Sequence, residues 1–65
     1  MPSSVIKYFR YDPRTAVLKI TFVTGKVYEY LSVPQEIYNN MKEAFSKGQF
    51  FNKHIRDHFT FRILE

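Results

Sequence analysis

The residues with the clearest potential for chemistry lie between Ser46 and Arg56. Ser46 and Gln49 have the spacing of a capping box, in which a serine accepts a hydrogen bond from a first-turn amide of a helix. The free amides at a helix start carry a partial positive charge and bind phosphate well. Lys47 adds a cation there and Gly48 gives close access to the backbone. These residues predict a phosphate site at a helix N-terminus.

The predicted helix extends this site along one face. Asn52, Lys53 and Arg56 follow at helical spacing and add an amide and two cations. RNA or another polyanion fits such a surface, and exposed aromatic rings beside it would stack on bases. The aromatic candidates are Tyr28, Tyr30 and Phe50.

A structural interpretation of the same residues stays open. Capping alone accounts for Ser46 and Gln49, and the basic side chains would then form an ordinary solvated face. The two tyrosines would be core residues. A second functional class is a protein-interaction or assembly module, because 65 residues barely suffice to hide seven Phe and five Tyr side chains.

The histidines and Ser46 do not make a convincing catalytic or metal site. His54 and His58 stand four positions apart, which can place two imidazoles on zinc, but the sequence has only these two histidines and no cysteine for a third ligand. Asp57 would point to another side of the helix. Ser46 and His54 are a poor nucleophile and base, since an N-cap serine uses its oxygen on the backbone. We predict no metal, no cofactor and no enzymatic activity.

A hairpin over residues 16–31 is expected to position these groups. A three-residue loop at 23–25, with Gly25 in the left-handed conformation, fixes its register. Side chains alternate between the two faces of a strand, so the tyrosines share the core face. This register pairs Phe22 with Lys26, Ile20 with Tyr28, and Leu18 with Tyr30 on one face, and Thr21 with Val27, Lys19 with Glu29, and Val17 with Leu31 on the other.

A first strand at residues 5–11 precedes the hairpin. Ile6 is out of phase with Phe9 and Tyr11, which favours a β-bulge. The Asp-Pro-Arg-Thr turn at 12–15 makes this strand an antiparallel neighbour of the hairpin. The three strands form a meander.

A first helix is predicted from a capping box at Ser32 and Gln35 to about Ala44. Apolar residues recur at helical spacing and form a stripe that can cover the aromatic face of the sheet. The stripe consists of Val33, Ile37, Met41 and either Ala44 or Phe45.

A second, shorter helix is predicted from Lys47 to about Asp57. Phe45 and Phe50 flank its cap at the spacing of a hydrophobic staple. The tail at 60–64 suits a fourth strand on a sheet edge. The predicted fold is α+β: a three- or four-stranded antiparallel sheet with one longer and one short helix on one face. The buried stripe of the second helix consists of Phe51, Ile55 and Phe59.

Length and composition set the remaining expectations. A chain of 65 residues predicts a single domain over 1–65. A net charge of +4 favours weak attraction to polyanions without naming a partner. The sequence has no apolar run of membrane-spanning length, and Met1-Pro2-Ser3-Ser4 lacks signal-peptide features, so we expect a cytoplasmic monomer or weak homodimer without a membrane partner.

Several motifs occur along almost the whole chain in a fixed order and spacing: Met1-Pro2-Ser3-Ser4 before Ile6, Tyr11-Asp12-Pro13, the segment 25–30 with its tyrosine pair, Val33-Pro34, the segment 46–52, and Ile55-Arg56. With these motifs the chain resembles the KTSC domain. That family is named for a C-terminal extension of some lysyl-tRNA synthetases and also occurs as small bacterial and phage-related proteins. The resemblance implies a domain of unestablished activity, for which RNA binding has been proposed by association with the synthetase.

Overall fold

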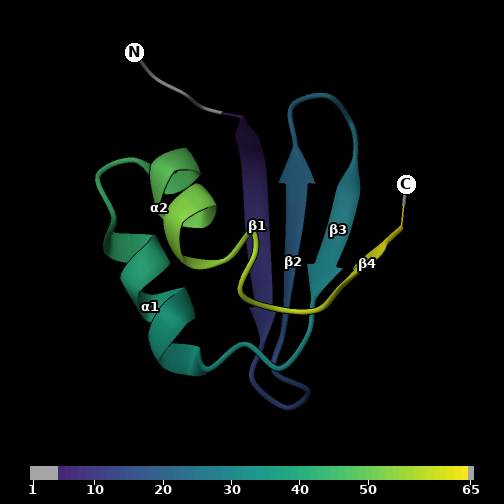
Figure 1. Cartoon of the computed structure of the whole chain (residues 1–65), viewed down its shortest axis with the longest axis vertical. Coiled ribbons are helices and arrows are strands. Elements are labelled where there is room, and N and C mark those ends of the chain that lie inside the picture. Colours follow the sequence, from purple (N-terminus) through teal and green to yellow (C-terminus); the bar gives the residue numbers. More distant parts are fainter. Residues whose placement is uncertain (1–4, 65) are drawn as a thin grey trace.

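The computed structural model describes residues 5–64, which form four strands and two helices joined by turns. The strands form one antiparallel sheet in the order β1-β2-β3-β4, and both helices lie on the same side of it (Figure 1). The predicted α+β fold is confirmed, with the tail as a fourth strand. The Met1-Pro2-Ser3-Ser4 motif lies outside the described residues. The elements are β1 (Ile6–Asp12), β2 (Val17–Phe22), β3 (Val27–Tyr30), α1 (Gln35–Glu43), α2 (Lys47–His54) and β4 (Phe61–Ile63).

The β2–β3 hairpin has the predicted register. At its turn the Phe22 amide donates to the Lys26 carbonyl at 2.9 Å. Gly25 has a φ of 97°, the left-handed conformation that the three-residue loop requires. The cross-strand pairs are Leu18 with Tyr30, Lys19 with Glu29, Ile20 with Tyr28, and Thr21 with Val27.

The predicted β-bulge lies in β1. The register with β2 shifts between Ile6 and Tyr8, which leaves Lys7 as the extra residue. Ile6 can therefore join Phe9 on the core side although the two are out of phase in the sequence. In the following turn the Asp12 carboxylate accepts the Arg14 amide at 2.9 Å, as expected for a turn-forming aspartate.

The core lies between the sheet and the two helices. α1 reaches β1 through Tyr38, whose ring stacks on Tyr11 with centroids 4.8 Å apart. α2 contributes Phe51, which meets Phe22 and Tyr30 edge to face. Such aromatic pairs add about 0.5–1.5 kcal/mol each beyond the burial of their area. The buried apolar residues are Leu18, Ile20, Tyr30, Val33, Met41, Phe51 and Ile55.

The capping box predicted for the first helix is wrong. Ser32 has a φ of 57°, and the N-cap residue is Pro34, which makes no side-chain capping bond. The segment is held instead by Val33, whose amide donates to the Ala16 carbonyl at 2.9 Å and whose carbonyl accepts the Tyr11 hydroxyl at 2.7 Å. Burying the Val33 side chain in the core stabilises the chain more than a Ser32 cap would, so the chain adopts this path.

The predicted staple at the second helix is also wrong. Ala44 leaves the helical conformation, with φ −68° and ψ 141°, and Phe45 then points fully into solvent. Phe45 therefore belongs neither to the α1 stripe nor to a staple. α2 ends at His54 rather than near Asp57. Ile55 lies in the turn that follows the helix, and its side chain is buried in the core.

The bond between Tyr11 and Val33 gives a test of how the helices are anchored. Tyr11→Phe removes the hydroxyl but keeps the ring on Tyr38, and we expect a loss of about 1 kcal/mol in the free energy of unfolding. Tyr8→Phe is the matched control, because Tyr8 lies on the same strand and is 60% exposed. Urea unfolding followed by circular dichroism measures both variants. Equal losses would show that the bond does not anchor α1.

Candidate functional site

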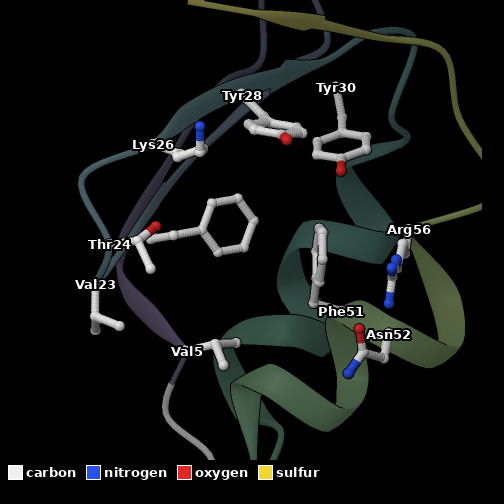
Figure 2. Close-up of a pocket in the computed structure, with 10 residues that line it drawn as sticks. Val5, Val23, Thr24, Lys26, Tyr28, Tyr30, Phe51, Asn52 and Arg56 are labelled. Carbon is white, nitrogen blue, oxygen red and sulfur yellow. The ribbon is translucent and has the colours of Figure 1, made fainter. Parts of the chain in front are cut away.

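A pocket opens between β3, the β2–β3 turn and α2. Its volume of about 390 Å³ falls within the range of small-molecule sites. Figure 2 shows Tyr28 and Tyr30 side by side along one wall, with Asn52 and Arg56 across from them. The lining residues are Val5, Phe22, Val23, Thr24, Lys26, Tyr28, Tyr30, Phe51, Asn52 and Arg56.

Contacts between aromatic rings hold the pocket walls in place. The Tyr28 and Tyr30 rings are nearly parallel, with centroids 6.3 Å apart. Phe61 of β4 packs on both, at 5.3 Å and 5.4 Å. Phe51 meets Tyr30 edge to face at 5.4 Å, and Phe22 meets Tyr28 at 5.4 Å. Because Tyr30 and Phe51 are core residues and Tyr28 and Phe22 pack against the core, the pocket is formed before any ligand arrives.

The polar groups of the pocket favour a negatively charged ligand. Lys26 and Arg56 bring two cations to the lining, Asn52 brings an amide, and no carboxylate lines the pocket within residues 5–64. Guanidinium groups bind phosphate with parallel hydrogen bonds. The arrangement suits a flat ring carrying or adjoining an anionic group.

Tyr30 contributes a hydroxyl that stays protonated at neutral pH. Burial, together with the nearby Tyr28 and Asp57, raises the pKa of Tyr30 to about 12 against the opposing charge of Arg56. The Tyr30 residue is 2% exposed, yet it lines the pocket. Its hydroxyl is therefore a hydrogen-bond donor available at the pocket.

The groups predicted for the helix N-terminus make contacts within the protein. Ser46 caps α2, and its hydroxyl accepts the Gln49 amide at 3.2 Å. The Lys47 ammonium donates to the Ala44 carbonyl at 2.8 Å, so it stabilises the end of α1. Gly48 is buried.

The other predicted site residues divide between two hollows. Asn52 and Arg56 line the pocket with Tyr28 and Tyr30. Lys53 lies in a shallower hollow on the solvent side of α2, which Asn52 also borders. The residues around that hollow are Ala44, Phe45, Ser46, Gln49, Phe50, Asn52, Lys53 and His54.

The histidines have local contacts. The His54 ring lies 4.6 Å from the Phe50 ring, and a His58 ring nitrogen lies 3.0 Å from the Lys53 carbonyl. No group of three or more His, Cys, Asp or Glu residues that could hold a metal ion occurs in the described part of the chain. Over the same residues, no helix has the length and apolar character needed to cross a bilayer.

The predicted site did not include Lys26 and Phe51, which line the pocket, or Phe61, which packs on its two tyrosine rings. Lys26 had a usable signal, because the hairpin register already placed it on the face of Tyr28 and Tyr30. Phe51 was predicted as core, and its second role as a pocket wall depends on how α2 crosses the sheet. The position of Phe61 beside the tyrosine rings depends on the register between β4 and β3, which the sequence does not determine.

Comparison with known proteins agrees with this geometry. A family model of the KTSC domain matches residues 2–59. The chain belongs to the KTSC domain family. A crystal structure of a KTSC domain protein from Yersinia pestis superposes with a TM-score of 0.87 and 37% identity, covering 100% of this chain and 94% of that one.

Relatives of this KTSC domain also occur within longer proteins. A lysine–tRNA ligase of Nostoc punctiforme is 48% identical over 61 residues, and one of Nostoc sp. is 41% identical over 61 residues. The match covers 94% of this chain but only 11% of each ligase. A protein of Stutzerimonas stutzeri is 36% identical over 53 residues, which is 75% of its length. The family thus includes both a segment of ligases and small proteins.

The raised pKa of Tyr30 predicts how stability depends on alkaline pH. Above pH 10 the unfolded chain loses this proton more readily than the folded chain, whose Tyr30 titrates near 12. The stabilising contribution is therefore complete below pH 10 and is lost as pH rises toward 12. We expect the free energy of unfolding to fall less steeply in Tyr30→Phe than in the wild type over this range. Denaturant unfolding at several alkaline pH values measures this free energy in both proteins. If it falls equally steeply with pH in the two, the raised pKa of Tyr30 is contradicted.

Proposed function

We propose that this KTSC domain is a non-catalytic accessory domain that binds single-stranded RNA and takes one nucleotide into the pocket at Tyr28 and Tyr30. The observation that carries the proposal is the combination of fixed aromatic walls, two cations and no lining carboxylate. Single-stranded RNA is recognised by stacking of splayed bases on aromatic rings and by cations that bind its phosphates.

Each pocket residue has a definite part in this proposal. Tyr28 is only half-buried and offers ring surface to a base, whereas the Tyr30 ring is buried and offers mainly its hydroxyl. Arg56 and Lys26 pair with the phosphate, and the Asn52 amide can donate to and accept from a base edge.

The names of the relatives support RNA over other polyanions. Lysine–tRNA ligases carry the segment that is 48% identical to this chain, and their name includes an RNA. Because this chain spans 11% of their length, we extend only the class of nucleic acid to it, and not the ligase activity.

The phosphate site at the start of α2 stays a prediction. Its backbone amides are near Gly48, but Ser46 and Lys47 already have protein partners. Titration with inorganic phosphate, followed by amide chemical shifts, separates this site from the pocket. Shifts at residues 47–49 without shifts at Tyr28 and Tyr30 would favour the helix N-terminus.

A protein-interaction function has one observation in its favour. Phe61, Ile63 and Leu64 are 44%, 60% and 46% exposed on or beside the edge strand β4. Exposed apolar groups on a sheet edge can pair with another chain. Sedimentation at rising protein concentration tests for self-association through this edge.

Two substitutions in the pocket test the RNA proposal. We expect Tyr28→Ala to weaken binding of an oligonucleotide of about ten nucleotides by roughly tenfold, since stacking contributes ~1–3 kcal/mol per base. Tyr28→Phe keeps the ring and should bind nearly as tightly as the wild type. Fluorescence anisotropy with labelled oligoadenylate measures both affinities.

A charge-matched pair tests the part played by Arg56. Arg56→Ala should reduce the slope of log affinity against log salt by about 0.7, the value for one phosphate contact on a single strand. Arg14→Ala removes the same charge from the β1–β2 turn and should leave the slope unchanged. If both variants behave alike, the effect is one of net charge, and the pocket is not the RNA site.

A further inference from the structure

The sheet face opposite the helices carries cations that belong to none of the sites above. Phe9 and Ile20 are opposite each other and pack into the core, so their neighbours along the strands face outward. Those neighbours include Tyr8, Arg10 and Lys19. Both helices lie on the other side of the sheet (Figure 1).

One row across the outer face places like charges side by side. Arg10 lies directly opposite Lys19, and Lys19 lies opposite Glu29 in the next strand. The Glu29 carboxylate forms its ion pair with Arg62 of β4. Within residues 5–64, Arg10 and Lys19 form no ion pair, although both also border a neighbouring hollow with the carboxylates of Asp12 and Glu29. Directly opposed like charges destabilise a sheet, and an anion bound between them would relieve that repulsion.

The same cations line a groove. Its volume is about 440 Å³, and its lining includes Lys7, Arg10 and Lys19 but no described carboxylate. The β-bulge brings Lys7 to this groove beside Tyr8. Tyr8 is 60% exposed, so ring surface is available next to three cations.

We propose that this outer face is a second RNA-binding surface, on which Lys7, Arg10 and Lys19 bind phosphates and Tyr8 stacks on a base. Neighbouring strands are about 4.8 Å apart, so Arg10 and Lys19 can reach one phosphate together. The choice of RNA as the ligand rests on the proposed function. The location of the surface rests only on the groove and the strand register.

The two surfaces meet at the β2–β3 turn. Thr24 and Lys26 line the pocket, whereas Gly25 and Val27 line the outer groove. An RNA strand with a base in the pocket can therefore pass around the turn and continue over the outer face. An acidic protein would use the cations but would not need the exposed ring, which is why the observations favour RNA.

The double variant Arg10→Ala with Lys19→Ala tests the surface in the full chain. With labelled oligoadenylate of about ten nucleotides, we expect the salt slope to fall by roughly 0.7, which is the one single-strand phosphate contact that the two side chains share. The matched control is Arg14→Ala with Lys42→Ala, which removes two charges elsewhere. The urea midpoint of the Arg10 and Lys19 variant should stay equal or rise, because the repulsion is gone, so weaker binding does not reflect unfolding.

Tyr8 provides the second measurement. Tyr8→Ala should weaken binding by roughly tenfold and Tyr8→Phe should not, as expected for stacking. Amide shifts of residues 7–10 and 19–21 during the titration locate the contact.

The outcomes separate the two proposals. Loss of binding in the outer-face variants alone supports this surface and overturns the pocket, while loss in the pocket variants alone overturns this surface. Equal effects of the double variant and its control would also overturn it. Binding to polyglutamate or anionic vesicles as tight as to RNA would overturn the assigned ligand class.

Discussion

The register of the β2–β3 hairpin is the constraint on which both surfaces of the molecule depend. The Gly25 turn aligns the strands so that Tyr28 and Tyr30 share the core side with their partners in β2. The same alternation sends Lys19 to the opposite face. A slip of one residue would exchange the two faces. The aromatic pocket and the cationic outer groove thus both follow from the register of β2 and β3. A change in that register would alter both surfaces at once.

A chain of 65 residues has little apolar surface to spare, so residues that line its pocket also belong to its core. Phe51 and Tyr30 are both buried core residues and pocket walls. Their edge-to-face packing fixes the pocket in the free protein. A preformed site loses little conformational entropy on binding, which allows a small domain to bind a ligand with few contacts. Truncating a buried wall residue such as Tyr30 or Phe51 therefore lowers both the stability of the fold and the affinity for a ligand. Tyr28 is half-buried and Arg56 is exposed, so substitutions there change affinity with less effect on stability.

Sequence patterns predicted the sheet and the cap of α2 better than the start of α1, and the difference has a physical cause. The hairpin register follows from a glycine turn and cross-strand pairs that lie close in sequence, so local chemistry determines it. Ser32 has the spacing of a cap, but the chain there must bring Val33 into the core and adopts another path. Lys47 was expected to face a ligand, but the Ala44 carbonyl at the end of α1 takes its ammonium. Arg56, one of the predicted site residues, lines the pocket from the turn after α2, and Lys26 lines it on the face where the predicted register placed it.

β4 links the two surfaces through the alternation of its side chains. Phe61 points inward and packs on both tyrosine rings, which steadies the pocket wall. Arg62 points outward and pairs with Glu29. Glu29 is also the cross-strand neighbour of Lys19, so the Arg62 guanidinium offsets part of the negative charge beside the outer row. The β4 strand therefore shapes one surface by packing and the other by charge, although its own side chains are largely exposed. Among the described residues, the pocket has no lining carboxylate because the core face of the hairpin carries none, whereas on the outer face Asp12 and Glu29 border a hollow next to the groove.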